Sequence, residues 1–285
     1  MVQGQTAVFA IFGDPIAHSL SPVMQNAALQ QEGIDGIYVP FRVRPEDLPA
    51  AVESIRTLHL AGINVTVPHK EKIVPFCDDL DEDARLIGAV NTVVPLQGKL
   101  IGYNTDGIGF ITSLQQDLDL CAEKKRILLL GAGGACRAAL VALCRAGAAR
   151  VAIANRNFAR AAALVNEFSP LYPGTLLEAL PFAETLAGAF PAALHLLVNT
   201  TSVGLKGETL PGLNLDALST STLVYDMVYA QGSTTPLVEA ARQKGIRAVD
   251  GLGMLAGQGE EAFRLWTSRC LAPGTMRRAL ELSHE

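Results

Sequence analysis

In the first hundred residues, runs of apolar residues alternate with segments of helical periodicity. The apolar runs that predict β-strands cover residues 6–12, 37–43 and 61–67. Ser21-Pro22 is typical of a helix start, with a capping serine and a first-turn proline, and predicts a helix to about Glu32. Residues 45–58 have apolar side chains three and four positions apart, which predicts a second helix. Two short runs joined by Gln97-Gly98, residues 90–95 and 100–103, predict a hairpin.

The alternation continues in the second half of the chain. Residues 127–130 are all apolar, as expected for a parallel strand that is buried on both faces. Further strands are predicted at residues 151–154, 175–178, 194–198, 223–225 and 247–249. Helices are predicted at residues 107–118, 135–146, 158–168, 236–244 and, as the last pair, 254–282. Strands that alternate with helices predict a doubly wound, Rossmann-like sheet.

The sequence therefore predicts an α/β protein of two lobes with a cleft between them. Residues 1–105, completed by the C-terminal helices in 253–285, form the expected substrate-binding lobe. Residues 106–252 form the expected dinucleotide-binding lobe.

Composition narrows the class of protein. The chain has 285 residues, of which 49% are hydrophobic and 18% charged, and a net charge of -5. This charge argues against nucleic acid or a membrane surface as the main partner. Residues 1–11 lack the features of a signal peptide, and no apolar run reaches the roughly 20 residues of a membrane span. The five cysteines contain no Cys-x-x-Cys pair, so we expect no metal site and a cytoplasmic location.

A glycine-rich turn directly follows the strand at 127–130. Gly131 permits a tight turn, and Gly133 lets the backbone approach a pyrophosphate at the start of the next helix. Cys136 stands where the dinucleotide fingerprint has its third small residue. An ordinary strand-to-helix turn is the alternative, but the second strand at 151–154 favours a nucleotide site.

The end of that second strand indicates which dinucleotide binds. An NAD site has an acidic residue there, whereas this chain has Asn155-Arg156-Asn157 followed by Arg160. Two arginines suit a 2′-phosphate, although both are also ordinary charges for an exposed helix start. Because the acidic residue of an NAD site is missing, the sequence predicts NADP(H) as the cofactor.

Three polar constellations lie in the first lobe. Ser19 and Ser21 are two positions apart in an extended segment, so both hydroxyls can bind one carboxylate, although Ser21 alone is explained as a helix cap. Asn64, Thr66 and Lys70 surround the end of the third strand, although an exposed amine is usual for a lysine. Asn91 is explained equally well as an ordinary strand-end residue, and Asp106 as an ordinary helix cap.

Together these motifs resemble one family. The chain contains, in order, Ser-x-Ser-Pro, Asn-Val-Thr-x-Pro-x-Lys, Gly-Ala-x-Asn-Thr, Asn-Thr-Asp-Gly, Gly-Ala-Gly-Gly-Ala, Asn-Arg and Gly-Met-Leu-x-x-Gln. The set is similar to the shikimate dehydrogenase family over essentially the whole chain. The resemblance implies reversible reduction of 3-dehydroshikimate to shikimate with NADPH, on the route to chorismate and aromatic amino acids. The sequence leaves the oligomeric state open between a monomer and a homodimer.

The resemblance also implies roles for individual residues. Lys70 and Asp106 would be the catalytic pair, with Lys70 favoured as acid/base group and Asp106 as the partner that orients its amine. The sequence leaves open which of the two carries the transferred proton. The substrate-binding residues would be Ser19, Ser21, Asn64, Thr66, Lys70, Asn91, Asp106, Tyr229 and Gln258. The cofactor-binding residues would be Gly131, Ala132, Gly133, Gly134, Ala135, Asn155, Arg156, Asn157, Arg160, Thr200, Met227, Gly251 and Met254. A packed aromatic is an equally good explanation of Tyr229, and family members often have Thr or Ser in place of Asn157.

Other functions remain open at this stage. The nearest alternative is a quinate/shikimate dehydrogenase with relaxed substrate or NAD use, but the absent acid and Ser21, where quinate-preferring relatives often carry Thr, weigh against it. A related oxidoreductase acting on an amino-shikimate is a second alternative. A catalytically silent NADP-binding sensor is a third, but such a protein has little reason to retain Lys70, Asp106 and Gln258 together.

Overall fold

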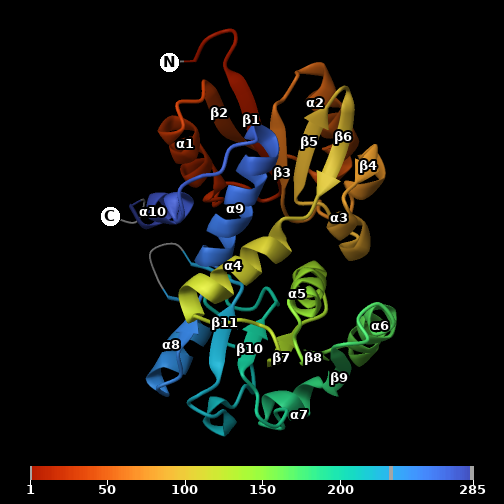
Figure 1. The fold of residues 1–285 in the computed structure, drawn as a ribbon, viewed down its shortest axis with the longest axis vertical. Helices are drawn as coiled ribbons and strands as arrows, with labels where there is room; N and C mark the ends of the chain where they lie inside the picture. The colour runs from red at the N-terminus through yellow and green to blue at the C-terminus, as the bar shows by residue number, and fades with distance from the viewer. Residues whose placement is uncertain (1, 231–233, 283–285) are drawn as a thin grey trace. The chain divides into compact units, whose positions relative to one another are not determined.

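The computed structural model describes residues 2–230 and 234–282, which form two compact units (Figure 1). The first unit is Met1–Gly109 with Leu255–Glu285, and the second is Phe110–Met254. The chain passes between the units within helix α4 (Asp106–Leu118) and again within helix α9 (Leu252–Thr267). Residues 283–285, at the end of the expected C-terminal segment, lie outside the described residues. None of the described helices is both long and apolar enough to cross a membrane.

A six-stranded mixed sheet forms the centre of the first unit. Its strand order is β2-β1-β3-β5-β6-β4. The strands are β1 (Ala7–Gly13), β2 (Gly36–Arg42), β3 (Gly62–Val65), β4 (Asp79–Leu80), β5 (Thr92–Leu96) and β6 (Lys99–Tyr103). β1 pairs in parallel with β2 and β3, whereas β5 runs antiparallel to both β3 and β6. The three predicted strands and the predicted hairpin are confirmed.

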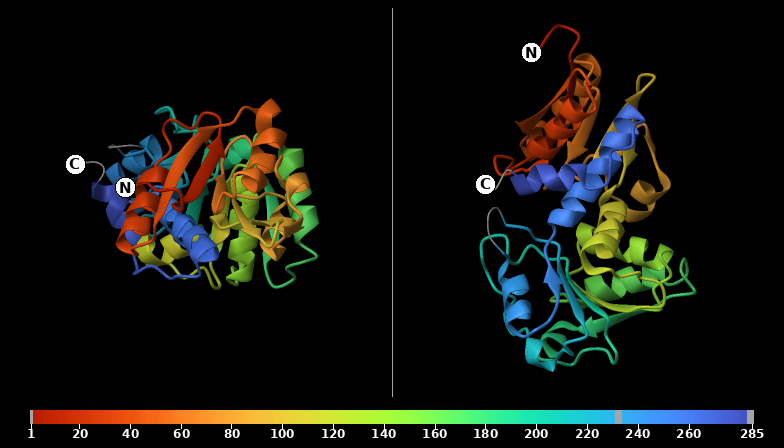
Figure 2. Two further views of the ribbon diagram at one scale, coloured as in Figure 1. Left: turned by 90° about the horizontal axis from the view of Figure 1, so that it is seen from above. Right: turned by 60° about the vertical axis from the view of Figure 1, so that its left-hand side comes forward.

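Helices α1 (Ser21–Gln31), α2 (Leu48–Thr57), α3 (Glu82–Ile87) and α10 (Thr275–Leu282) complete this unit together with the end of α9. α1 contacts β2 and α10 (Figures 1 and 2). Near the end of α9, the Trp266 indole lies against Gly62 and donates to the Val93 carbonyl at 3.1 Å. A Cβ at residue 62 would overlap this ring, so glycine is needed there for the helix to approach the sheet.

Three details of the first unit differ from the sequence predictions. Ser21 is the first helical residue of α1 and Leu20 is its N-cap, so Ser21 does not cap the helix. Residues Pro45–Asp47 form a 3-10 turn before α2 because a proline follows at the second helical position. The short strand β4 and helix α3 were not predicted, since neither is long enough to show a period; the Asp81 side chain caps α3.

The second unit contains a six-stranded parallel sheet of order β12-β11-β10-β7-β8-β9. Its strands are β7 (Arg126–Leu130), β8 (Arg150–Asn155), β9 (Leu176–Pro181), β10 (Leu196–Asn199), β11 (Leu223–Asp226) and β12 (Ala248–Val249). Its helices are α5 (Gly134–Arg145), α6 (Phe158–Phe168), α7 (Phe182–Leu186) and α8 (Pro236–Gln243), with a 3-10 turn at Leu215–Ala217. This is the doubly wound order that the alternating pattern predicts.

The central strands of this sheet are apolar because both of their faces are covered. Ile127–Leu130 and Val151–Ala154 are almost fully buried. β9 was predicted at 175–178 but extends to Pro181, and α7 directly after it was not predicted. With five residues, α7 is too short to show a helical period.

Candidate functional site

The turn from β7 into α5 has the geometry of an anion-binding site. Gly131 has a φ of 114°, and a Cβ there would lie 2.7 Å from the Thr200 hydroxyl. α5 begins with Gly133 as its N-cap, without a hydrogen bond from a capping side chain. The first amide groups of α5 are therefore available to a ligand and carry the positive end of the helix dipole.

A pocket of about 680 Å³ opens beside this turn. It is lined by Gly131, Ala132, Gly133, Asn155, Arg156, Phe182, residues 200–203 and residues 208–211. β7 and β10 are neighbours, and from them the chain continues in opposite directions along the sheet, to β8 and to β11. The pocket contains the residues that follow both strands. Parallel α/β sheets bind ligands at such a switch point. Residues 208–211 were not predicted as part of the site because the loop that contains them has no motif.

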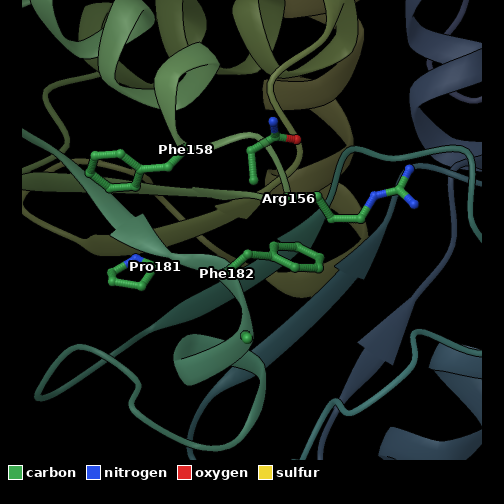
Figure 3. Close-up of a pocket in the computed structure, with 6 residues that line it drawn as sticks. Arg156, Phe158, Pro181 and Phe182 are labelled. Atoms are coloured by element: carbon green, nitrogen blue, oxygen red, sulfur yellow. The ribbon is translucent and has the colours of Figure 1, made fainter.

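A second pocket, of about 570 Å³, adjoins the end of β8. It is lined by Asn155, Arg156, Phe158, Pro181, Phe182 and Ala183 (Figure 3). A guanidinium beside aromatic rings suits a flat base that carries a nearby phosphate. Phe158 and Phe182 were missed by the sequence analysis, although Pro181-Phe182 at a strand end was an available signal. Asn157 and Arg160 are exposed near this pocket on the N-terminal side of α6 but do not line it.

Other predicted cofactor residues lie between the end of β11 and the first turn of α9. The Gly251 amide donates to the Val228 carbonyl, and a Cβ at residue 251 would lie 2.4 Å from the Met227 carbonyl oxygen. Met254 is in the first turn of α9, and Tyr229 is half-buried. Burial raises the pKa of Tyr229, so its hydroxyl is neutral at ordinary pH.

Asp226, at the end of β11, holds this segment by hydrogen bonds. It is fully buried and accepts hydrogen bonds from Asn199 at 2.8 Å, Thr235 at 2.8 Å and the Val228 amide at 3.1 Å. Burial raises the pKa of Asp226 to about 6, although its hydrogen bonds act in the opposite direction.

In the first unit, the predicted polar residues form a hydrogen-bond network. Lys70 Nζ donates to Asp106 Oδ2 at 2.6 Å, and Asn91 Nδ2 donates to Asp106 Oδ1 at 2.8 Å. Gln258 Oε1 lies 3.4 Å from the same Asn91 nitrogen. The Lys70 side chain is 32% exposed, so its amine is in contact with solvent while Asp106 is largely buried.

The network continues to Asn64, whose side-chain amide donates to the Asn91 carbonyl and to Thr92 Oγ1, both at 3.1 Å. Ser19 Oγ accepts from the Ser21 amide at 3.3 Å, beside the start of α1. Leu20, between the two serines, has a helical backbone and not the extended one that the prediction assumed, and the hydrogen bond joins the backbone of Ser21, not its hydroxyl, to Ser19. Among the described residues, the hydrogen bonds of this network do not include the Thr66 side chain, which is half-buried just after β3.

The two sites differ in the chemistry that they permit. The second unit has a backbone anion site, a basic side chain and aromatic walls. The first unit has an amine paired with a carboxylate, surrounded by amides and hydroxyls. This pair can hold and orient a proton next to a hydroxylated ligand. Fold and sites together define a dinucleotide-binding α/β protein of the oxidoreductase type.

Comparison with known proteins identifies the family. Three family models match the chain, "Shikimate dehydrogenase substrate binding domain" at residues 11–93, "Shikimate / quinate 5-dehydrogenase" at 113–185 and "Shikimate 5'-dehydrogenase C-terminal domain" at 251–281. The shikimate dehydrogenase (NADP(+)) of Geobacter metallireducens is 51% identical over 277 residues, 97% of this chain and 96% of that protein. The chain belongs to the shikimate dehydrogenase family.

Solved structures agree with this assignment and show its breadth. The Thermus thermophilus shikimate 5-dehydrogenase, in complex with NADP(H) and shikimate, is 37% identical, with a TM-score of 0.84 over 97% of this chain and 99% of that one. The 5-ketofructose reductase of a Gluconobacter species is 33% identical, with a TM-score of 0.88 over 99% of this chain and 100% of that one. Similarity of fold alone therefore does not determine which carbonyl compound is reduced.

Proposed function

We propose that the protein catalyses the reversible, NADPH-dependent reduction of 3-dehydroshikimate to shikimate, a step towards chorismate and the aromatic amino acids. The activity class follows from family membership, which makes the chain an NADP-dependent dehydrogenase. The observation that carries the proposal is the network of Lys70, Asp106, Asn91 and Gln258, which presents a proton donor among groups that suit ring hydroxyls.

NADP(H) fits the second unit by the chemistry of its residues. The free amides at the start of α5 suit the pyrophosphate, for which we assign Gly131, Ala132, Gly133, Gly134 and Ala135. Arg156 faces both pockets and, with Asn155, Asn157 and Arg160, is assigned to the 2′-phosphate. We assign Thr200, Met227, Gly251 and Met254 to the nicotinamide side. When bound, NADPH supplies the hydride.

The first unit is assigned to the substrate. Ser19 and Ser21 would bind the carboxylate at the start of α1, where the helix dipole favours negative charge. Asn64, Thr66, Asn91, Asp106 and Gln258 would bind the ring hydroxyls, and Tyr229 is assigned as a further substrate-binding residue. The boundaries we propose are 1–105 with 253–285 for the substrate lobe and 106–252 for the cofactor lobe.

Lys70 and Asp106 are the proposed catalytic pair. Reduction of a ring carbonyl places negative charge on its oxygen, and that oxygen must gain a proton. The Lys70 ammonium can stabilise this charge and donate the proton. Asp106 accepts a hydrogen bond from Lys70, so it fixes the direction of the amine.

The function is tested by measuring NADP⁺ reduction with shikimate, beside NAD⁺ and quinate in a two-by-two panel. We expect turnover concentrated in the combination of shikimate and NADP⁺. Strong turnover of quinate or with NAD⁺ would retain the dehydrogenase class and reject the proposed specificity. Binding of NADP(H) without turnover in any combination would instead support the sensor alternative.

We also place the protein in the cytoplasm. Cys121 and Cys270 are free, exposed thiols, and such thiols suit a reducing compartment.

A further inference from the structure

Tyr38 is a buried polar residue that the proposed catalytic mechanism does not use. It lies in the middle of β2 and is 2% exposed. The Asn26 side chain from α1 binds both the amide and the carbonyl of Tyr38, each at 2.8 Å. The backbone of Tyr38 is therefore held to the helix that begins at Ser21.

The hydroxyl of Tyr38 connects two proposed substrate-binding residues. It donates to Asn64 Oδ1 at 2.7 Å, and the Ser21 side chain hydrogen-bonds to the same hydroxyl. Burial raises the pKa of Tyr38 well above its usual value, so the hydroxyl remains protonated and can donate. One buried group thus touches both the proposed carboxylate-binding end and the proposed ring-binding end.

The hydrogen bonds of Asn64 leave only its side-chain oxygen able to accept a further hydrogen bond. Both amide hydrogens are directed to acceptors, the Asn91 carbonyl and Thr92 Oγ1, each at 3.1 Å. Because a carbonyl can only accept, the Asn64 nitrogen must lie on that side, and Tyr38 occupies one lone pair of the opposite oxygen. The second lone pair of Oδ1 is the remaining hydrogen-bonding capacity of this side chain.

We propose that Tyr38 is a positioning residue. The Asn91 carbonyl makes the Asn64 oxygen an acceptor, and Tyr38 holds that oxygen in place, so that the site selects a substrate hydroxyl able to donate at that position. The proposal rests on the proposed function, because it takes shikimate as the ligand. A ring substituent that only accepts, such as fluorine, would face the Asn64 oxygen without a hydrogen bond.

The test compares kcat and KM for shikimate and for two analogues in which each non-reacting ring hydroxyl is replaced by fluorine. In the wild type, one of the two analogues is expected to lose at least about tenfold in kcat/KM. In Tyr38→Phe, KM for shikimate is expected to rise about fivefold with kcat changed by less than about twofold, since one neutral hydrogen bond orients Asn64. Discrimination against the same analogue should fall by a similar factor.

Tyr225→Phe is the matched control. Tyr225 is as fully buried as Tyr38, and its hydroxyl lies 2.7 Å from Ser113 Oγ and hydrogen-bonds to the Met254 backbone. Its loss should lower stability to a similar extent, measured by thermal unfolding, and at saturating NADP⁺ should leave KM for shikimate and the discrimination unchanged.

Two results would overturn the inference while leaving the function in place. One is a Tyr38→Phe enzyme with unchanged KM and unchanged discrimination. The other is a wild-type enzyme whose kcat/KM for each of the two fluorinated analogues equals that for shikimate. A wild type that does not turn over shikimate with either cofactor would reject the proposed function, and this inference with it.

Discussion

At the scale of single residues, Asp106 shows how one side chain can join the start of a helix to a hydrogen-bond network. It opens α4, and its two carboxylate oxygens accept from different donors, Lys70 and Asn91. The sequence left open whether Asp106 was only a helix cap. The pairing with Lys70, 36 positions away, decides in favour of a place in the network.

Replacement of Lys70 by alanine tests this pair. We expect kcat for shikimate oxidation to fall by about 10²- to 10⁴-fold with a modest change in KM, because a proton donor acts mainly in the transition state. Steady-state kinetics with NADP⁺ would measure both constants. Lys72→Ala, at an exposed lysine two positions away, is the control and should retain normal kinetics. A near-normal kcat in Lys70→Ala would remove Lys70 from the mechanism.

Asp226 predicts a pH dependence of stability. Its pKa is raised from 3.8 to about 6 in the folded state, so the folded protein holds a proton that the unfolded chain has lost between these values. The contribution of Asp226 to the free energy of unfolding is therefore largest at low pH. It is lost as the pH rises from about 4 to about 6, by about 3 kcal/mol in total.

Comparison with Asp226→Asn isolates this effect from those of other carboxyl groups. The asparagine retains an oxygen for Asn199 and Val228 and does not titrate. Urea unfolding of both proteins at pH values from 4 to 7 should show the wild type losing stability relative to the variant as the pH rises. A constant difference across this range would show that Asp226 titrates normally.

At the scale of elements, the turn between β7 and α5 combines two different uses of glycine. Gly131 needs its left-handed conformation and has no room for a side chain, because Thr200 follows the neighbouring strand β10. Gly133 has no positive φ and open space around the position of a Cβ. The first glycine therefore serves the fold, and the second leaves room for a ligand.

Alanine at each position should separate these uses. Gly131→Ala is expected to lower the free energy of unfolding by about 1–3 kcal/mol, because of strain and overlap with Thr200. Gly133→Ala should retain normal stability but raise KM for NADP⁺. Urea unfolding and cofactor titration measure the two effects, with Gly174→Ala, which has open space and no positive φ, as control. Equal effects of both substitutions on stability would contradict this division.

At the scale of the whole molecule, each unit has its own sheet and its own apolar core. The five cysteines report on both units. Cys121 in the second unit and Cys270 in the first are exposed, whereas burial raises the pKa of Cys77 and Cys144 to about 11 and that of Cys136 to about 12. Reaction with disulfide reagents requires the thiolate, so the last three should react slowly.

Thiol labelling of the native protein at neutral pH should therefore show fast reaction at Cys121 and Cys270, and slow reaction of the other three until the protein unfolds. Peptide mass spectrometry after timed labelling assigns each site. In increasing urea, Cys136 and Cys144 should become reactive together, because both lie on α5 of the second unit. Fast labelling of Cys136 in the native protein would contradict the burial of this side chain on α5.

Much of this molecule could be predicted from local sequence. The alternation of apolar runs and helical periods determined the α/β class and the doubly wound order, because strands buried on both faces must be apolar throughout. The glycine turn and the residues after β8 indicated a dinucleotide, since backbone approach and local charge are properties of short segments. Short elements such as β4, α3 and α7 were missed because they do not span enough residues to show a period.

Only the tertiary structure decided which polar residues meet. Lys70, in the turn after β3, binds Asp106 at the start of α4. Tyr38 on β2 binds Asn64 on β3, and in both pairs the partners are distant in the chain. Phe182 lies beside Arg156 because β9 pairs with β8, a register that no local pattern specifies. The sequence by itself determined which elements form and which chemical groups are present. The pairing of the strands decided the partners of each side chain, because hydrogen bonds depend on distance in space and not on separation along the chain.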